Sequence, residues 1–317
     1  KSLPVFIRCS EKRGKEGKGG NGGNAENAAP PTTLTINKNV DLKALSSGNE
    51  YIPIGGLAQS GGGVGGDGGD CNSLFGCPDG DRGGGGGFAG DVTINNDGII
   101  ELEITDQQCS NTEDGESCAG GAGLLAQSVG GQGGNASAQG ISLVTFGGAG
   151  GTGGGGGKIN VTHTGLITTR GIGAIGINAQ SVGGSGGSVP DSYSAVTLGS
   201  SEGGLGGEAQ TVSVNLDAGI IRTNGNYAPG ILSQSIGGGG GSVGSQASIN
   251  TIGSTAGAGG DGGEATITLQ NNGLIETGEH FKLNTETREG FFSPAVIVQS
   301  VGGGGGNAGS NQGVITV

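Results

Sequence analysis

The sequence contains no methionine and no tryptophan, and aromatic residues make up only 3% of its 317 residues. Hydrophobic residues reach 31%, which is too lean for the thick core of an ordinary globular domain. No run approaches the ~18 apolar residues that a membrane-spanning helix requires. These absences favour a narrow core of short stacked strands, in which each layer contributes a few Val, Ile, Leu and Ala side chains.

Positive charge is also scarce, and the formal net charge is −13. The distribution is uneven, because residues 1–18 carry +4 and the rest of the chain carries −17. Nucleic acid and anionic membrane surfaces both attract a basic face rather than an acidic one. We therefore expect neither nucleic-acid binding nor direct membrane insertion by this chain.

Only five cysteines and two histidines are present. Cys71 and Cys77 flank one short loop, and Cys109 and Cys118 flank another. Close pairs in a loop-rich chain predict local disulfides and an oxidising compartment. Zinc is the alternative, but neither pair has Cys-x-x-Cys spacing. Cys9 is left over and is available for pairing between chains.

Glycine, in contrast, supplies 81 residues, about a quarter of the chain, against a usual ~7%. Five glycine runs follow a Gln-Ser pair, and the glutamines are 68, 53, 54 and 65 residues apart. A unit that recurs in this way is typical of stacked repeats. Identical amides one layer apart can bond to each other. We therefore predict a ladder of Gln59, Gln127, Gln180, Gln234 and Gln299.

Short strands are predicted between the glycine runs. Segment 92–100 alternates β-branched and polar residues around an Asn-Asp-Gly corner, and related segments occupy 159–167, 212–221 and 267–275. A second strand leads into each Gln-Ser pair, and a third lies between two glycine runs. The pattern predicts an all-β fold, a parallel β-solenoid of about five repeats without helices. The expected inward side chains are Ile94, Ile99, Val161, Leu166, Val214, Ile220, Leu269 and Leu274.

Three structures are open to the glycine runs: flexible linkers, tight turns or flat strands, and extended polyproline-II-like helices. Linkers rarely recur in phase with strands, which favours ordered, polyglycine-like tracts. Ordering glycine costs more backbone entropy than ordering any other residue. Such tracts therefore require many mutual hydrogen bonds.

Glycine-rich ligand motifs do not match. Gly157-Lys158 lacks the first glycine and the Ser or Thr of a nucleotide phosphate loop. Segments 65–70 and 259–264 resemble calcium-binding nonapeptides, but they lack the required hydrophobic residue and tandem copies. We expect no cofactor and no bound metal.

The chain is expected to divide into an N-terminal segment, 1–29, and a repeat body, 30–317. Insertions at 70–82, 105–118 and 278–292 are expected as side loops of the stack. Both ends of the chain resemble the third strand of the unit. The chain is therefore expected to start and stop in the same phase of its repeat.

The N-terminal segment is a candidate for self-assembly. Leu3, Val5 and Ile7 are apolar on alternate residues, and a free strand of this kind is an aggregation hazard. Addition of this strand to the sheet edge of another copy would satisfy both edges, and opposite charges favour the encounter. We predict a head-to-tail homopolymer. The alternative is that residues 1–29 belong to a preceding unit of the same solenoid.

A composite motif recurs along the body: a strand, an Asn-Asn-x-Gly turn, Ile-Ile-x-Thr, and then Gly-Ile-x-Ala-Gln-Ser before glycine. Over about residues 32–317 it resembles the glycine-rich passenger repeats of large autotransporter outer-membrane proteins of Gram-negative bacteria. The resemblance implies a secreted β-solenoid at the cell surface, with an adhesive or structural role and no catalytic residues to carry over. The sequence shows neither a signal peptide nor a C-terminal barrel translocator, so we expect a processed chain or a segment of a longer one.

The expected function is a non-enzymatic extracellular stalk or fibre-forming subunit that binds its own copies or a cell-surface or matrix ligand. One alternative is a passenger fragment with a receptor-binding loop. Phe291 and Phe292 are the only paired aromatics and would form a contact patch there, or else the core of that loop.

The other alternative is a carbohydrate-active enzyme on a β-helix, which requires paired carboxylates. Glu101 and Glu103 share one strand face near Asp106. The corresponding positions in other units are expected at Thr168, Arg222 and Thr277-Gly278, so the acids do not recur and a solvated edge is favoured. His163 is expected in the turn at the position of Asp97 and Asp217, where a polar turn residue suffices.

Overall fold

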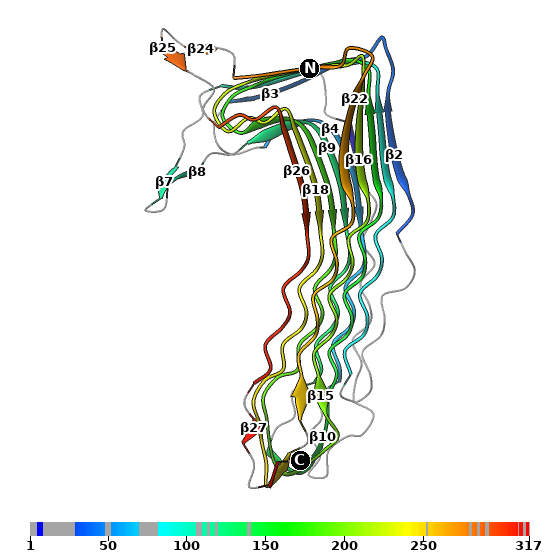
Figure 1. Ribbon diagram of the computed structural model, residues 1–317, viewed down its shortest axis with the longest axis vertical. Coiled ribbons are helices and arrows are strands. Elements are labelled where there is room, and N and C mark those ends of the chain that lie inside the picture. The colour runs from blue at the N-terminus through cyan, green and yellow to red at the C-terminus, as the bar shows by residue number, and fades with distance from the viewer. Residues whose placement is uncertain are drawn as a thin grey trace.

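The structure, a computed structural model, is an elongated blade built from β-strands and extended segments (Figure 1). All regular structure in the described part of the chain is β, without helix. The described residues are 5–8, 29–47, 52–69, 82–105, 110–112, 115–117, 120–137, 141–251, 253–278, 281–283, 286–288, 292–309, 311–312 and 315–316.

The chain follows one path repeatedly, and β11 (Ile159–His163), β12 (Leu166–Arg170) and β13 (Ala174–Val182) illustrate it. An ascending strand is followed by a top strand and then by a descending strand that ends in Gln-Ser. A glycine-rich run next leads to the distal end of the blade, where β14 (Ser192–Leu198) lies, and a second run returns (Figure 1). We call each set of three such strands a layer and name it by its descending strand.

Equivalent strands of successive layers pair side by side into parallel sheets. The ascending sheet contains β2 (Thr32–Ile36), β5 (Val92–Asn96), β11, β16 (Val212–Asp217) and β22 (Ala265–Gln270). The top sheet contains β3 (Asp41–Ser47), β6 (Ile99–Thr105), β12, β17 (Ile220–Asn224) and β23 (Leu274–Thr277). The descending sheet contains β1 (Val5–Arg8), β4 (Ile54–Gly61), β9 (Gly121–Val129), β13, β18 (Ile231–Ile236) and β26 (Val296–Val301). This arrangement of stacked parallel sheets is that of a β-solenoid.

The distal end has its own sheet. It joins β14 to β10 (Ile141–Phe146), β19 (Gln246–Ala247), β20 (Asn250–Thr251), β27 (Asn311–Gln312) and β28 (Ile315–Thr316). A short parallel pair, β15 (Ser201–Glu202) with β21 (Ser254–Thr255), lies beside it. Two antiparallel hairpins follow top strands: β7 (Ser110–Thr112) with β8 (Gly115–Ser117), and β24 (Phe281–Leu283) with β25 (Glu286–Arg288).

The core is a narrow aliphatic column between the three main sheets. Ile94, Val161 and Val214 are buried in it as predicted, but Ile99, Leu166, Ile220 and Leu274 are not. The alternation of inward and outward residues continues through the corner between β5 and β6 instead of restarting after it. The next residue of each top strand therefore faces inward, and these residues are Ile100, Ile167, Ile221 and Ile275.

Leu269 is the remaining exception. It lies in register with the buried Leu216, yet 48% of its side chain is exposed. The strands of the β26 layer have no described neighbour on their outer side, so inward positions there remain accessible.

The first strand corrects the expectation about repeat phase. β1 pairs in parallel with β4, so Val5 lies opposite Gly56 and Ile7 opposite Ala58. The strand Val5–Arg8 therefore occupies the descending sheet of its own chain. The last strand, β28, pairs instead with β20 in the distal sheet. The two ends are consequently in different phases of the repeat.

The glycine-rich runs are joined by backbone hydrogen bonds at every third residue. Along one outgoing run, Gly130, Gly133 and Ala136 donate their amides to carbonyls of the next outgoing run at 2.8–2.9 Å. The following residues bond to the antiparallel return runs instead, since Gly131 donates to Gly87 and Gly134 donates to Gly84. Each outgoing run therefore bonds both to the outgoing run of the next layer and to a return run that lies antiparallel to it.

This bonding leaves no room for a side chain at two of every three positions. A methyl group built on Gly207 would overlap the carbonyl oxygen of Gly154. At the third position the space is open: on Gly239 the nearest atom would be the Gly304 oxygen, 3.7 Å away. Other runs carry Gln132, Ser185 and Leu205 at such third positions. The glycine pattern is therefore set by the contact between backbones.

Two alanine substitutions test this close contact. We expect Gly207→Ala to lower the free energy of unfolding by about 2–3 kcal/mol, because the new Cβ separates two backbones. We expect Gly239→Ala to be neutral or to stabilise by about 0.5 kcal/mol, because it only reduces the freedom of the unfolded chain. Denaturant unfolding of both variants measures the difference, and equal effects would contradict the packing described here.

Candidate functional site

The Gln-Ser pairs form the most regular polar feature of the molecule, at the lower end of the descending sheet. The strands place each pair in register with the next, so Gln127 lies opposite Gln180 and Ser128 opposite Ser181. Successive residues of a strand face opposite sides. The glutamines therefore lie on the outer face of the sheet and the serines point inward.

The glutamine amides are joined in a continuous column. Each Nε2 donates to the Oε1 of the glutamine in the next layer, at 2.9 Å from Gln59 to Gln127 and at 3.0 Å from Gln127 to Gln180. The Gln180–Gln234 distance is 2.7 Å, and Gln234 donates in turn to Gln299. All amides point the same way, so each interior glutamine uses one donor and one acceptor within the column.

The serines bind the return runs to the descending sheet. The Ser181 hydroxyl donates to the Gly157 carbonyl at 2.9 Å and accepts the Gln210 amide at 3.0 Å. The same two bonds occur at Ser128, which donates to Gly90 and accepts from Gly157. These hydroxyls are fully buried. The hydroxyl of the Gln-Ser motif thus links two successive return runs at each interior layer.

A third polar column runs down the outgoing runs, eight residues after each glutamine. Asp67 Oδ1 accepts the backbone amide of Asn135 at 2.7 Å, and Asn135 Oδ1 accepts that of Ser188 at 2.8 Å. The Ser188 and Ser242 hydroxyls accept from the next layers at 3.1 Å. These bonds provide acceptors for backbone amides that do not bond to a neighbouring glycine-rich run. Sequence reasoning assigned no role to the serines or to this column, although their constant spacing from the glutamines was visible.

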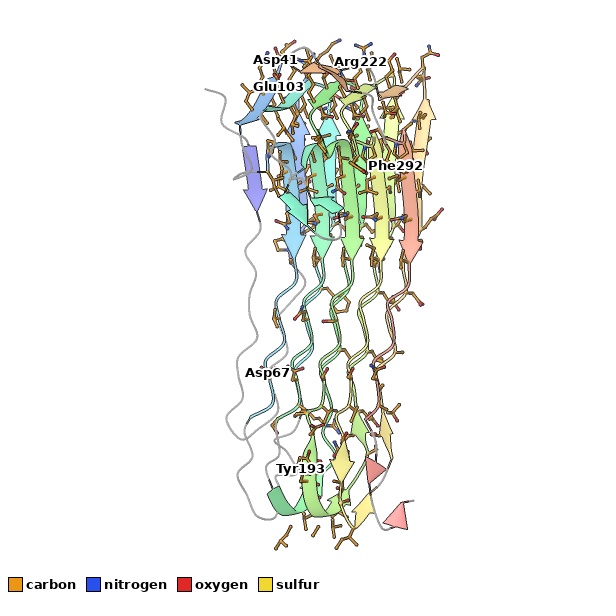
Figure 2. All side chains as sticks on the ribbon, turned by 90° about the vertical axis from the view of Figure 1, so that its left-hand side faces the viewer. Asp41, Asp67, Glu103, Tyr193, Arg222 and Phe292 are labelled. Carbon is orange, nitrogen blue, oxygen red and sulfur yellow. The ribbon has the colours of Figure 1, made fainter. Side chains whose placement is uncertain are left out.

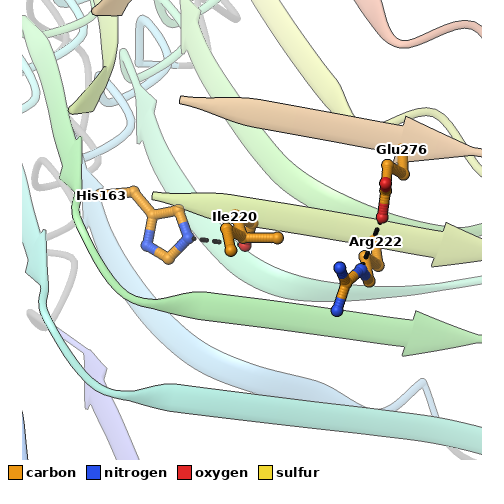
Figure 3. Close-up of polar contacts among 4 residues, drawn as sticks. All are labelled: His163, Ile220, Arg222 and Glu276. Carbon is orange, nitrogen blue, oxygen red and sulfur yellow. Dashed lines mark hydrogen bonds and ion pairs between the residues drawn. The ribbon is translucent and has the colours of Figure 1, made fainter. Parts of the chain in front are cut away.

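His163 lies in the core rather than in the turn. It is in register with Asn96 and Leu216, not with Asp97 and Asp217, and it is fully buried. Nε2 lies 3.2 Å from the Ile220 carbonyl (Figure 3), and Nδ1 lies 3.0 Å from the side-chain nitrogen of Asn96. These contacts fit the neutral ring, in which Nε2–H donates and Nδ1 accepts. Burial lowers the pKa of His163 below its usual value, although the carbonyls of Ile220 and Asn96 oppose the shift.

Charged residues on the outer face of the top sheet form ion pairs between layers. Lys43 lies 2.7 Å from Glu101, and Arg222 lies 2.6 Å from Glu276 (Figure 3). The hydrogen bond and charge of Glu101 raise the pKa of Lys43. Register places Glu276, not Thr277, at the position of Glu101, so an acid does recur there. Such exposed pairs contribute little to stability.

The described residues can also be assessed for metal-binding clusters and membrane-spanning helices. They contain no group of three or more His, Cys, Asp or Glu side chains that could hold a metal ion. Within the same part of the chain, no helix is long and apolar enough to cross a membrane. The predicted residues Leu3, Cys9, Cys71, Cys77, Asp106, Cys109, Cys118 and Phe291 lie outside the described ranges.

Comparisons of the chain with protein-family models, with curated proteins and with solved structures found no match. The function must therefore be argued from the geometry above.

Removal of one buried serine should destabilise the blade more than removal of the adjacent glutamine. Ser181→Ala leaves the Gly157 carbonyl and the Gln210 amide without their partner, and we expect a loss of about 2–4 kcal/mol. Gln180→Ala breaks two part-exposed bonds, with an expected loss of about 1–2 kcal/mol. Ser185→Ala, at an open third position, is the control and should change little. The free energy of unfolding is the measurement, and the reverse order would contradict the assigned roles.

The buried histidine predicts a pH dependence of stability. Its pKa is lower in the folded chain, so the unfolded chain binds the proton first as pH falls below about 6.5. Stability is therefore complete above that pH and declines below it, by at most about 1.4 kcal/mol per pH unit from this group. His163→Asn, the residue type of the neighbouring layer, should flatten the decline between about pH 6.5 and 5. An unchanged slope in this variant would show that other groups cause it.

Proposed function

We propose that this chain is a non-enzymatic extracellular scaffold: a stalk or fibre-forming segment of a secreted, cell-surface protein. The observation that carries the proposal is that the glutamine, serine and lateral backbone bonds continue from layer to layer without interruption. A one-dimensional lattice of this kind is extended by adding layers and does not depend on a central pocket.

The glycine runs support the same role. We propose that they are polyglycine helices with three residues per turn, ordered by the bonds to their neighbours. Two runs per layer give a long, thin blade from few residues. A blade of this shape exposes a large surface and spans a long distance, as a stalk does.

The chemistry of the described residues favours a scaffold over the carbohydrate-active alternative. Glu101 is held in an exposed ion pair with Lys43, and Glu103 lies opposite Leu45 and Arg170 rather than opposite another acid. A glycosidase requires two carboxylates that converge on one bond. The proposed disulfides Cys71–Cys77 and Cys109–Cys118 would suit an oxidising extracellular compartment.

We further propose that copies of the chain associate by stacking. Val296, Val298 and Val301 of β26 are 42%, 45% and 46% exposed, whereas the equivalent Ile231 and Ser233 one layer earlier are fully buried. This difference arises because a further parallel strand covers β18. A further layer in the same register, supplied by a second copy or by a continuation of the polypeptide, would bury this apolar edge and satisfy its backbone groups.

Imaging and sedimentation test this proposal together. Negative-stain images should show straight blades, and sedimentation should show association that increases with protein concentration. Val301→Lys should reduce association by placing a charge on the edge strand at an outward position, since Val301 lies opposite the outward Ile236. Leu205→Lys, a 54% exposed position on a return run, is the matched control. Compact particles would contradict the scaffold, and a wild-type chain that stays monomeric would contradict stacking.

A further inference from the structure

The corner between a top strand and its descending strand carries an unusual pair of residues in two adjacent layers. In the β13 layer Gly173 occupies this corner with a φ of 69°. Register places Tyr227 at the same position in the β18 layer and Phe292 in the β26 layer. Their φ values are 55° and 50°. Left-handed backbone costs a residue with a side chain about 1 kcal/mol, and glycine would avoid that cost.

The two rings are displayed rather than buried. Their centroids are 5.9 Å apart with planes inclined by 13°, so they stack along the axis of the layers. Tyr227 is 52% exposed and Phe292 67% exposed. Figure 2 shows Phe292 toward the end of the blade that carries Arg222, far from Tyr193 at the distal end. The strained corners therefore hold an aromatic surface in contact with solvent.

On its other side, Tyr227 faces a corner that has no side chain. A Cβ built on Gly173 would meet only backbone atoms, the nearest being the Gly120 Cα at 3.0 Å. Glycine at both positions forms a low floor beside the tyrosine ring. The result is a step: an aromatic face that stands above a glycine floor.

Polar groups accompany this step on the outer face of the top sheet. Asn224, three residues before Tyr227, has a buried Oδ1 that makes no hydrogen bond in the described structure. An acceptor of this kind is costly unless a donor reaches it. Arg170 lies in register with Asn224 and is exposed. Of these two residues, Arg170 is the one whose donors a ligand beside the step can reach, since Asn224 Oδ1 is closed off from solvent.

We propose that this step, with Tyr227 as its wall and Gly173 as its floor, binds a saccharide. A sugar ring has one apolar C–H face and an edge of hydroxyl groups, so it matches a flat aromatic ring near the exposed guanidinium of Arg170. Tyr227 and Phe292 are 52% and 67% exposed, so they offer a face for stacking rather than an enclosed recess for an apolar side chain. This site goes beyond the scaffold role and does not depend on it, because the corner geometry exists within one chain.

The test uses the intact chain and an array of neutral and acidic oligosaccharides, followed by titration of the best-bound soluble oligosaccharide. Isothermal titration calorimetry measures binding, because it requires no fluorophore at the site and applies equally to the wild type and to variants that lack a tyrosine. Tyr227→Gly should weaken binding about tenfold by removing the stacking face. Tyr227→Phe, which keeps the ring, should bind within about threefold of the wild type. Tyr193→Ser, also at a 52% exposed tyrosine, is the matched control and should bind normally.

Folding is not at risk in the main variant, because glycine accepts the positive φ and already occupies this corner in the β13 layer. Its circular dichroism and association state, measured on the same sample, distinguish loss of the saccharide site from failure of the scaffold. The proposal is overturned if the wild-type chain binds no oligosaccharide of the array, or if Tyr227→Gly and Tyr193→Ser bind equally well. Binding only of peptides on a parallel peptide array would assign the step to a protein partner instead.

Discussion

The whole structure depends on lateral hydrogen bonds between backbones at the spacing of one β-layer. Glycine has no side chain to bury, so a glycine run gains nothing from the hydrophobic effect and loses more conformational entropy than any other sequence. Its order must come from amide and carbonyl groups that find partners in neighbouring runs. The close approach that makes those bonds excludes a Cβ at two of three positions. This explains why glycine occupies those positions.

The rest of the blade keeps those runs in register. The aliphatic column between the main sheets fixes the height of each layer, and the Gln and Ser columns fix the place where a strand becomes a run. The serine has a particular role, because its hydroxyl is both donor and acceptor and can connect two backbone groups inside the junction. The glutamine repeats the same one-layer spacing on the outer face.

The proposed function follows from the contrast between the residues that bond from layer to layer and the few positions where the repeat is broken. The residues that bond from layer to layer use their polar groups on one another, and this suits a spacer or a fibre. The candidates for recognition are places where the repeat is broken: the hairpins inserted after two top strands, and the corner where Tyr227 and Phe292 replace glycine. At that corner the backbone of Tyr227 and Phe292 carries strain that the repeat does not require, and both rings are exposed to solvent.

The sequence by itself determined the all-β class, the parallel stacking of its strands and the positions of the glutamines, because these follow from a recurring motif whose copies must occupy equivalent places. It did not determine which isoleucine of each top strand faces the core. Ile99 and Ile100 are equally apolar, and only the bend at the corner decides between them. The alignment of His163 with Asp97 was wrong by one residue, although His163 stands two residues before Gly165 as Asn96 stands two residues before Gly98.

The tertiary structure alone decided how the polar groups are used. No local pattern shows that Ser181 joins Gly157 to Gln210, or that Tyr227 lies in register with Gly173, since these residues are many positions apart in the chain. The apolar pattern of Val5–Arg8 is compatible with several of the sheets, and only its pairing with β4 shows that it belongs to the descending sheet. Local sequence sets what each segment can form, whereas contacts between layers select the partner, because those contacts exist only once the layers are stacked.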